Sequence, residues 1–117
     1  MAHRVLIVDD NAGFRASARA LLDEEGFAVV GEAADGAQAL ARAANLRPDV
    51  VLLDIQLPDI DGFDVAERLA LLPDPPTVVL ISSRDESVFR LRLATTAARG
   101  FLAKSQLSGE ALAEFVA

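Results

Sequence analysis

Short apolar runs alternate with helical patterns five times along the chain. The runs hold four to seven residues and are rich in Val, Ile and Leu, as expected of strands that are buried on both faces. Between them, apolar residues recur every three or four positions, which is typical of amphipathic helices. This alternation predicts right-handed crossovers and an α/β fold with one parallel sheet covered by helices on both faces. The strands are expected at residues 4–8, 27–33, 49–54, 77–82 and 100–103.

Five helices are expected, one after each strand. Gly26 and Pro48 mark the ends of the first two, and the proline-rich stretch 73–76 stops the third. The first helix is expected to end near residue 26, and the second to run from 35 or 36 to before 48. The third is expected over 62–72, the fourth from 85 to about 97, and the fifth from 107 onward. The inward faces are predicted to hold Phe14, Ala18, Leu21 and Leu22 in the first helix, Ala37, Leu40, Ala41 and Ala44 in the second, and Phe63, Ala66, Leu69 and Ala70 in the third.

The bulk composition indicates one ordered domain with its own core. The chain has 117 residues, which is a common size for a single domain. A hydrophobic fraction of 52% argues against disorder. No apolar run approaches the roughly 20 residues of a membrane span, and the N-terminal apolar stretch meets acidic residues too soon for a signal peptide. The absence of cysteine excludes disulfides and thiolate metal sites, and it is compatible with a cytoplasmic location.

The net charge of the chain and its choice of basic residues both bear on its function. A net charge of −7 argues against direct nucleic-acid binding by this domain, because such binding relies on lysine and arginine neutralising phosphates. Of the eleven basic residues only Lys104 is a lysine. A compact ammonium is therefore a candidate for a specific function at that position. A plain surface cation is the alternative.

Several polar residues fall where the predicted strands end. In an open parallel sheet, the ligand crevice forms at the carboxyl ends of the strands, where the strand order reverses. With the flavodoxin-like order 2-1-3-4-5, the first and third strands are neighbours at that reversal, so their terminal residues are expected to meet. Asp9 and Asp10 follow the first strand, Asp54 ends the third, Ser82 ends the fourth, and Lys104 follows the fifth.

Three carboxylates gathered at one mouth need compensation. At about 4 Å and an effective dielectric of about 20, each pair costs on the order of 4 kcal/mol. Protonation could relieve this repulsion, or a hard divalent cation such as Mg²⁺ could, since it prefers oxygen ligands. Asp54 is then a metal ligand and a candidate nucleophile toward a phosphoryl group. Lys104 would neutralise the phosphoryl oxygens, Ser82 would donate to one of them, and the backbone carbonyl of Gln56 would complete the metal shell.

These residues lie in four motifs that resemble the receiver domain of two-component response regulators. The motifs occur in the family's order, and the resemblance spans essentially the whole chain. Residues 1–117 are therefore expected to form one receiver domain, either by itself or as the N-terminal part of a longer regulator. The C-terminal pattern looks most similar to receivers attached to LuxR-type helix-turn-helix domains. The motifs are LIVDDN at 6–11, VLLDIQLPDIDG at 51–62, LISS at 80–83 and GFLAKS at 100–105.

The resemblance implies a phosphorylation-controlled switch that turns over no external substrate. Asp54 would accept a phosphoryl group from a histidine kinase or phosphotransfer protein, with Mg²⁺ present. The face formed by the fourth helix, fifth strand and fifth helix would then control an output domain or partner protein, with a homodimer as one expected form and no membrane contact. The implied roles are metal binding by Asp9 (through water), Asp10, Asp54 and Gln56, phosphate contact by Ser82 and Lys104, and switching by Ser82 and Phe101.

Three departures from the family pattern leave alternatives open. Ser105 stands where a proline in a cis bond often follows the lysine, residues 95–99 lack the family's glycine, and Phe101 has no hydroxyl and could be fixed core. Helix four must therefore end by another device. A degenerate receiver that only docks proteins is one alternative. A Mg²⁺-dependent hydrolase is a weaker one, because no aspartate lies two residues after Asp54. Asp9 and Asp10 could be capping residues, Asp59 and Asp61 read as turn residues, and Arg90, Arg92 and Arg99 read as a solvated helix face.

Overall fold

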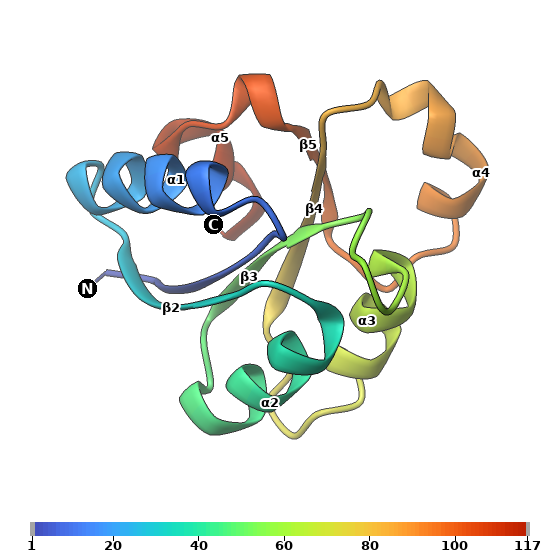
Figure 1. Cartoon of the computed structure of the whole chain (residues 1–117), viewed down its shortest axis with the longest axis horizontal. Helices are drawn as coiled ribbons and strands as arrows, with labels where there is room; N and C mark the ends of the chain where they lie inside the picture. The colour runs from blue at the N-terminus through green and yellow to red at the C-terminus, as the bar shows by residue number, and fades with distance from the viewer. Residues whose placement is uncertain (1, 117) are drawn as a thin grey trace.

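The computed structural model describes residues 2–116 and contains one sheet of five parallel strands (Figure 1). The strands follow the order β2-β1-β3-β4-β5, so the predicted fold class and strand order are confirmed. In chain order the elements are β1 (Arg4–Val8), α1 (Ala12–Glu24), β2 (Ala28–Ala33), α2 (Gly36–Leu46), β3 (Val50–Asp54), α3 (Gly62–Leu69), β4 (Thr77–Ser82), the 3₁₀ turn η1 (Glu86–Phe89), α4 (Arg90–Leu93), β5 (Gly100–Ala103), the 3₁₀ turn η2 (Lys104–Gln106) and α5 (Gly109–Val116).

The two faces of the sheet carry separate hydrophobic clusters. Successive side chains of a strand point to opposite faces, and in β1 this sends Val5 and Ile7 to one cluster and Leu6 and Val8 to the other. The first cluster lies under α1 and α5, and the second lies under α2 and α3 (Figure 1). Every residue of β3 is buried. The central strands therefore hold fixed positions, and so do the residues at their ends.

The third and fifth helices are shorter than the sequence pattern predicts. The third ends at Leu69 rather than at residue 72, and the fifth begins at Gly109 rather than at 107. The later start has a local cause, because the Ser108 hydroxyl accepts the Ala111 amide at 3.0 Å and residues 104–106 form a 3₁₀ turn. Within residues 2–116 no peptide bond is cis, in agreement with Ser105 in place of the usual proline. No helix in this range is long and apolar enough to cross a membrane.

The inward face of α2 differs from the prediction. Ala39 and Ala43 are buried against the sheet, whereas Ala37, Ala41 and Ala44 are exposed. Of the four residues predicted to face inward, only Leu40 packs against the core, and it does so partly. Alanines occur on every side of this helix, so their spacing alone does not define one face.

The fourth helix is the largest correction. A helix was predicted over 85–97, but the chain forms the 3₁₀ turn η1 followed by only four α-helical residues. Only Phe89 of the two elements is buried, so there is too little apolar contact to hold a three-turn helix, since most helix stability comes from packing. The segment ends without glycine, as predicted. The Ala94 and Thr95 amides donate to the backbone carbonyls of Arg90 and Arg92. Further on, the Ala97 amide donates to the Glu67 carboxylate at 3.0 Å and the Ala98 amide to the Thr96 hydroxyl at 3.2 Å.

Candidate functional site

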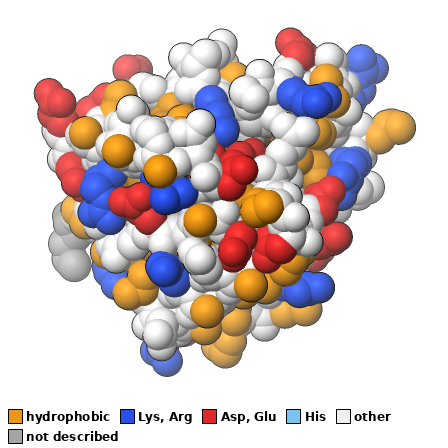
Figure 2. All heavy atoms as spheres, in the orientation of Figure 1, with side chains coloured by type: hydrophobic (Ala, Val, Ile, Leu, Met, Phe, Trp, Pro, Cys, Tyr) orange, Lys and Arg blue, Asp and Glu red, His pale blue; other side chains and the backbone are white. Residues whose placement is uncertain are grey.

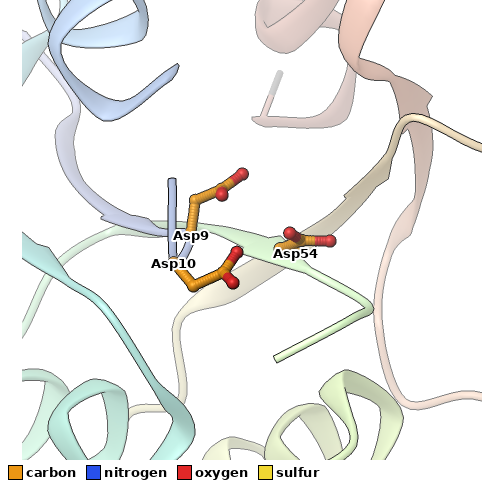
Figure 3. A group of neighbouring side chains, drawn as sticks. All are labelled: Asp9, Asp10 and Asp54. Carbon is orange, nitrogen blue, oxygen red and sulfur yellow. The ribbon is translucent and has the colours of Figure 1, made fainter. Parts of the chain in front are cut away.

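Three carboxylates meet at the carboxyl edge of the two central strands (Figure 3). Asp9 and Asp10 directly follow β1, and Asp54 is the last residue of β3. These strands are neighbours, with Val8 opposite Leu53, so the next residues of both strands reach the same mouth. One carboxylate oxygen from each aspartate lies within 4.8 Å of the others. Asp9 and Asp54 are buried, whereas Asp10 is exposed to solvent.

Asp9 holds one oxygen that lacks a hydrogen bond. Its Oδ1 accepts the Asn11 amide at 2.9 Å, and its backbone carbonyl accepts from the Arg15 guanidinium at 2.6 Å. Its Oδ2 is fully buried and accepts no hydrogen bond within residues 2–116, although Lys104 Nζ lies 2.6 Å away as an ion pair. A buried anionic oxygen without a hydrogen bond is costly. The position therefore favours a nearby positive charge.

Lys104 supplies that charge from the end of β5. Its Nζ lies 2.6 Å from Asp9 Oδ2, donates to Asp54 Oδ2 at 3.2 Å, and sits 4.7 Å from the centre of the Phe14 ring. Burial by itself would lower the pKa of Lys104, but the two carboxylates outweigh it, and the pKa is raised. The ammonium thus stays charged at neutral pH. The structure excludes the alternative that this lysine is a plain surface cation.

Asp9, Asp10, Asp54 and Lys104 together are called the acidic pocket below. Asp54 contacts the lysine within it and is 4% exposed. Its Oδ1 accepts the Gln56 amide at 3.0 Å, and its Oδ2 accepts from Lys104. Burial raises the pKa of Asp54, the Asp9 charge raises it further, and the Gln56 amide and the lysine oppose this rise. Its ionised form would therefore be stabilised by an added cation. The predicted role of the Gln56 carbonyl stays a prediction; the side chain of that residue is exposed.

Ser82 lies at the same edge of the sheet, at the end of β4. It follows Ile81, which is the register partner of Asp54, and it is fully buried. Its hydroxyl oxygen accepts the Arg84 amide at 3.0 Å. This places the hydroxyl one strand away from the acidic mouth, and its contact with a phosphoryl group remains a prediction.

Phe101 belongs to a row of aromatic rings rather than to the acidic pocket. It is partly buried in β5, opposite Leu80, and its ring centre lies 6.2 Å from that of Phe89. Phe89 in turn lies 6.1 Å from Phe63 at the start of α3. The row links β5 to η1 and α3 through packing of the rings, and Phe101 has no hydroxyl to add a hydrogen bond. Switching by Phe101 stays a prediction.

Sequence reasoning placed Phe14 only in the core and assigned no role to Arg15. The Phe14 ring lies against the Lys104 ammonium, a cation–π contact that helps hold the lysine in place. Arg15 donates to the Asp9 carbonyl at the turn into α1. The N-cap residue Asn11 was a sequence signal for the contacts of both Phe14 and Arg15. It starts α1 directly after the acidic pair, so the first turns of this helix lie over the acidic residues.

The donor set fits a hard divalent cation. Asp9, Asp10 and Asp54 offer only carboxylate oxygens, one of them buried beside the Lys104 ammonium and one on an exposed residue open to water. Mg²⁺ prefers such oxygens and keeps several waters. The direct binding predicted for Asp10, Asp54 and the Gln56 carbonyl, and the water-mediated binding predicted for Asp9, stay predictions. Lys104 would remain beside the metal as the second positive charge.

Known proteins are similar to this chain over most of its length. The family model described as "Response regulator receiver domain" matches residues 5–116. A protein of Pseudomonas aeruginosa named as a transcriptional regulator is 38% identical over 109 residues, which are 93% of this chain and 53% of that protein. The protein-glutamate methylesterase/protein-glutamine glutaminase 6 of Anaeromyxobacter dehalogenans is 42% identical over 107 residues, which are 91% of this chain and 30% of that protein.

A solved structure is similar over nearly the same range. The signal receiver domain named as that of the response regulator NarL from Mycobacterium tuberculosis is 34% identical, with a TM-score of 0.89, and the match covers 98% of this chain and 96% of that one. The chain spans about half the length of the P. aeruginosa relative. The family match covers the strands, the acidic edge and the lysine turn together. The chain therefore belongs to the receiver domain family of the two-component response regulators.

Proposed function

We propose that this receiver is a phosphorylation-controlled switch in which Asp54 accepts a phosphoryl group from the phosphohistidine of a histidine kinase or phosphotransfer protein. The observation that carries the proposal is the contact of Lys104 with both Asp9 and Asp54 beside the exposed carboxylate of Asp10. The pocket thus combines a nucleophile, a fixed ammonium and the oxygen ligands of a metal. Phosphoryl transfer relies on such positioning and charge neutralisation.

In the proposed transfer, a carboxylate oxygen of Asp54 attacks the phosphorus atom and forms an acyl phosphate. The bond from phosphorus to the imidazole nitrogen breaks, and the imidazole keeps the electron pair and takes a proton. Lys104 neutralises the charge of the phosphoryl oxygens, and Ser82 donates to one of them. Mg²⁺, held by the three aspartates, would supply further charge neutralisation. Attack by water on the acyl phosphate later returns the free carboxylate and inorganic phosphate.

The phosphorylated state would act through α4, β5 and α5. Ser82 and Phe101 would shift the population of two arrangements of this face, and an output domain or partner protein would read the change. The P. aeruginosa relative supports an output in transcription regulation, with this domain as the input half of a longer protein. The proposed location is the cytoplasm. The receiver itself would turn over no external substrate and make no direct contact with DNA, and a homodimer is one proposed form.

The test is phosphorylation of the purified chain by a small phosphodonor with Mg²⁺. The expected result is one added phosphoryl group by intact-protein mass spectrometry, which does not form when a chelator is present from the start and is absent in Asp54→Asn. An unchanged mass with several donors would contradict the proposal. Partner binding that is unaffected by Asp54→Asn or by beryllofluoride would instead favour a receiver that only docks proteins.

A further inference from the structure

The loop that follows the phosphoacceptor strand is tied at its middle to the start of another helix. This loop, 55–61, leads from β3 into α3 and carries Asp59 near its centre. Asp59 Oδ1 accepts the Gly36 amide at 2.7 Å, and its Oδ2 accepts the Ala37 amide at 3.0 Å. These amides belong to the first turn of α2, which packs beside α3 on the same face of the sheet (Figure 1).

The junction requires a close approach that only glycine permits at position 36. A Cβ there would lie 2.9 Å from Ile60 Cβ, 3.0 Å from Val65 Cγ2 and 3.2 Å from Asp59 Oδ1. The absence of a side chain lets the loop come down onto the helix. The hydrogen bond from the Gly36 amide keeps the pKa of Asp59 below its usual range, so the carboxylate is charged at neutral pH. The helix dipole also favours a negative charge at this end.

The same loop is fixed at both of its ends. At the start, the Gln56 amide donates to Asp54 Oδ1 at 3.0 Å. At the end, the Gly62 amide donates to the Ile55 carbonyl at 2.8 Å. Asp59 is the middle attachment, three residues after Gln56, whose carbonyl is a proposed metal ligand. A loop held only at its ends could move that carbonyl away from the metal.

We propose that Asp59 is a positioning residue for the metal site, which uses the first turn of α2 to hold the Gln56 carbonyl in place. The inference rests on the proposed magnesium site and assigns to Asp59 a role beyond that of a turn residue. Leu57 and Ile60 also pack against the core and restrain the loop. The effect of losing Asp59 is therefore expected to be moderate: about a 3- to 10-fold weaker affinity for Mg²⁺, at or below the range for groups that hydrogen-bond a ligand directly.

The chain offers a matched control at the same helix end. Asp35 is the N-cap of α2 and accepts the Gln38 amide at 2.8 Å, but no hydrogen bond of its side chain reaches the loop within residues 2–116. Asp35→Ala and Asp59→Ala each remove a carboxylate that accepts amides of the first turn of α2. Both should lower the unfolding midpoint by similar amounts, since both remove helix capping. Only Asp59→Ala should weaken Mg²⁺ binding.

The experiment titrates the ¹⁵N-labelled chain with MgCl₂ and follows the amide signals of residues 54–62 by NMR. The unmodified chain, Asp59→Ala, Asp59→Asn and Asp35→Ala are compared, with the unfolding midpoint of each measured by circular dichroism without Mg²⁺. Asp59→Asn should be intermediate, because its amide oxygen still accepts one of the two helix amides. If Asp59→Ala does not fold, the Mg²⁺ affinity of Asp59→Asn tests the inference in its place.

Equal dissociation constants for the Asp59 variants and Asp35→Ala would overturn the inference and leave the magnesium site intact. A weaker constant in Asp59→Ala, with Asp35→Ala unchanged, would support it. Failure of the unmodified chain to bind Mg²⁺ at these amides would overturn the metal site and this inference together. The two failures are therefore distinguishable in one set of titrations.

Discussion

The acidic pocket and the segment 84–99 differ in what fixes their side chains. In the pocket, Asp9 and Asp54 are buried and Lys104 is 19% exposed, with contacts between charged atoms at 2.6 and 3.2 Å. In the segment, only Phe89 is buried. Figure 2 shows basic and hydrophobic side chains together over α4, at the upper right of the molecule. The exposed residues of the segment include Arg84, Val88, Arg90, Leu91, Arg92 and Arg99.

This difference arises because the sheet holds the pocket, whereas only a few side-chain contacts hold the segment. The register of the central strands fixes the pocket, since a residue at the end of a buried parallel strand has little freedom. The segment instead relies on a few side-chain contacts. Arg92 pairs with Asp61 at 2.7 Å and lies 4.2 Å from the centre of the Phe63 ring, so it is more than the solvated residue that the sequence suggested. The segment can thus rearrange at low cost, whereas the pocket cannot.

The largest expected effect comes from removing the pocket's ammonium. Lys104→Met keeps the apolar stem but leaves Asp9 and Asp54 close together without their shared cation. Loss of one partner of a buried ion pair costs about 3–5 kcal/mol, and because this pocket is open on one side we expect about 2 kcal/mol of lost unfolding free energy. Urea unfolding without Mg²⁺ measures it. Added Mg²⁺ should restore more stability to this variant than to the unmodified chain.

Arg84→Met is the matched control for this prediction. Arg84 is an exposed cation near the same edge and forms no ion pair in the part of the chain that the structure describes. Its replacement should change the unfolding free energy by no more than about 0.5 kcal/mol. If the two variants are equally stable, the pocket is no more rigidly built than the segment, and the comparison fails.

A smaller effect is expected where α4 contacts α3. Arg92→Ala removes the ion pair with Asp61 and the cation–π contact with Phe63, which together contribute roughly 1 kcal/mol at a half-exposed site. Because the lost contacts hold only the segment, amide hydrogen exchange should accelerate over 86–97 and remain unchanged in β1 and β3. Arg90→Ala, at an exposed position without an ion pair among the described residues, should leave exchange unchanged. Faster exchange in the central strands of Arg92→Ala would contradict this division.

The same division explains how much of the fold the sequence could predict. Apolar runs of limited length and acids at their ends indicate buried parallel strands, and the geometry of such sheets then brings those acids together. The inward face of α2 could not be predicted, because alanines at 37, 41 and 44 satisfy the period as well as Ala39 and Ala43 do. The early end of α4 could not be predicted from the periodic pattern either, because it follows from how little of residues 86–93 packs against the rest of the fold.

The site was predictable to a similar degree. Asp9, Asp10, Asp54 and Lys104 meet as the strand ends require, since each one ends or directly follows a strand. The contacts that hold them were not predictable. The ring under the lysine, the guanidinium on the Asp9 carbonyl and the tie from Asp59 to α2 depend on how helices and loops pack over the sheet edge. Strand periodicity carries no information on these contacts.

The smallest expected effect concerns an ion cluster beside the pocket and depends on pH. Glu32 on β2 accepts from Arg15 at 3.0 Å and from Arg19 at 2.8 Å, and Arg15 also holds the Asp9 carbonyl. Arg19, and then Arg15, lower the pKa of Glu32 below its ordinary 4.5, against the effect of burial. Because the folded-state pKa is depressed, the cluster stabilises the fold above pH 4.5, and this contribution is lost as the pH falls through the folded-state value.

Glu32→Gln should therefore unfold more easily than the unmodified chain at pH 7, and the difference should shrink as the pH falls below 4.5 and through the lowered folded-state pKa. With 30% of the Glu32 side chain exposed, solvent screens the pairs, so we expect only about 0.5 kcal/mol at pH 7. Urea titrations at pH 7, 5 and 3.5 would measure it, with Glu24→Gln, at an exposed residue without an ion pair in the described range, as the control. A difference that persists or grows in acid would mean that Glu32 contributes through packing rather than charge.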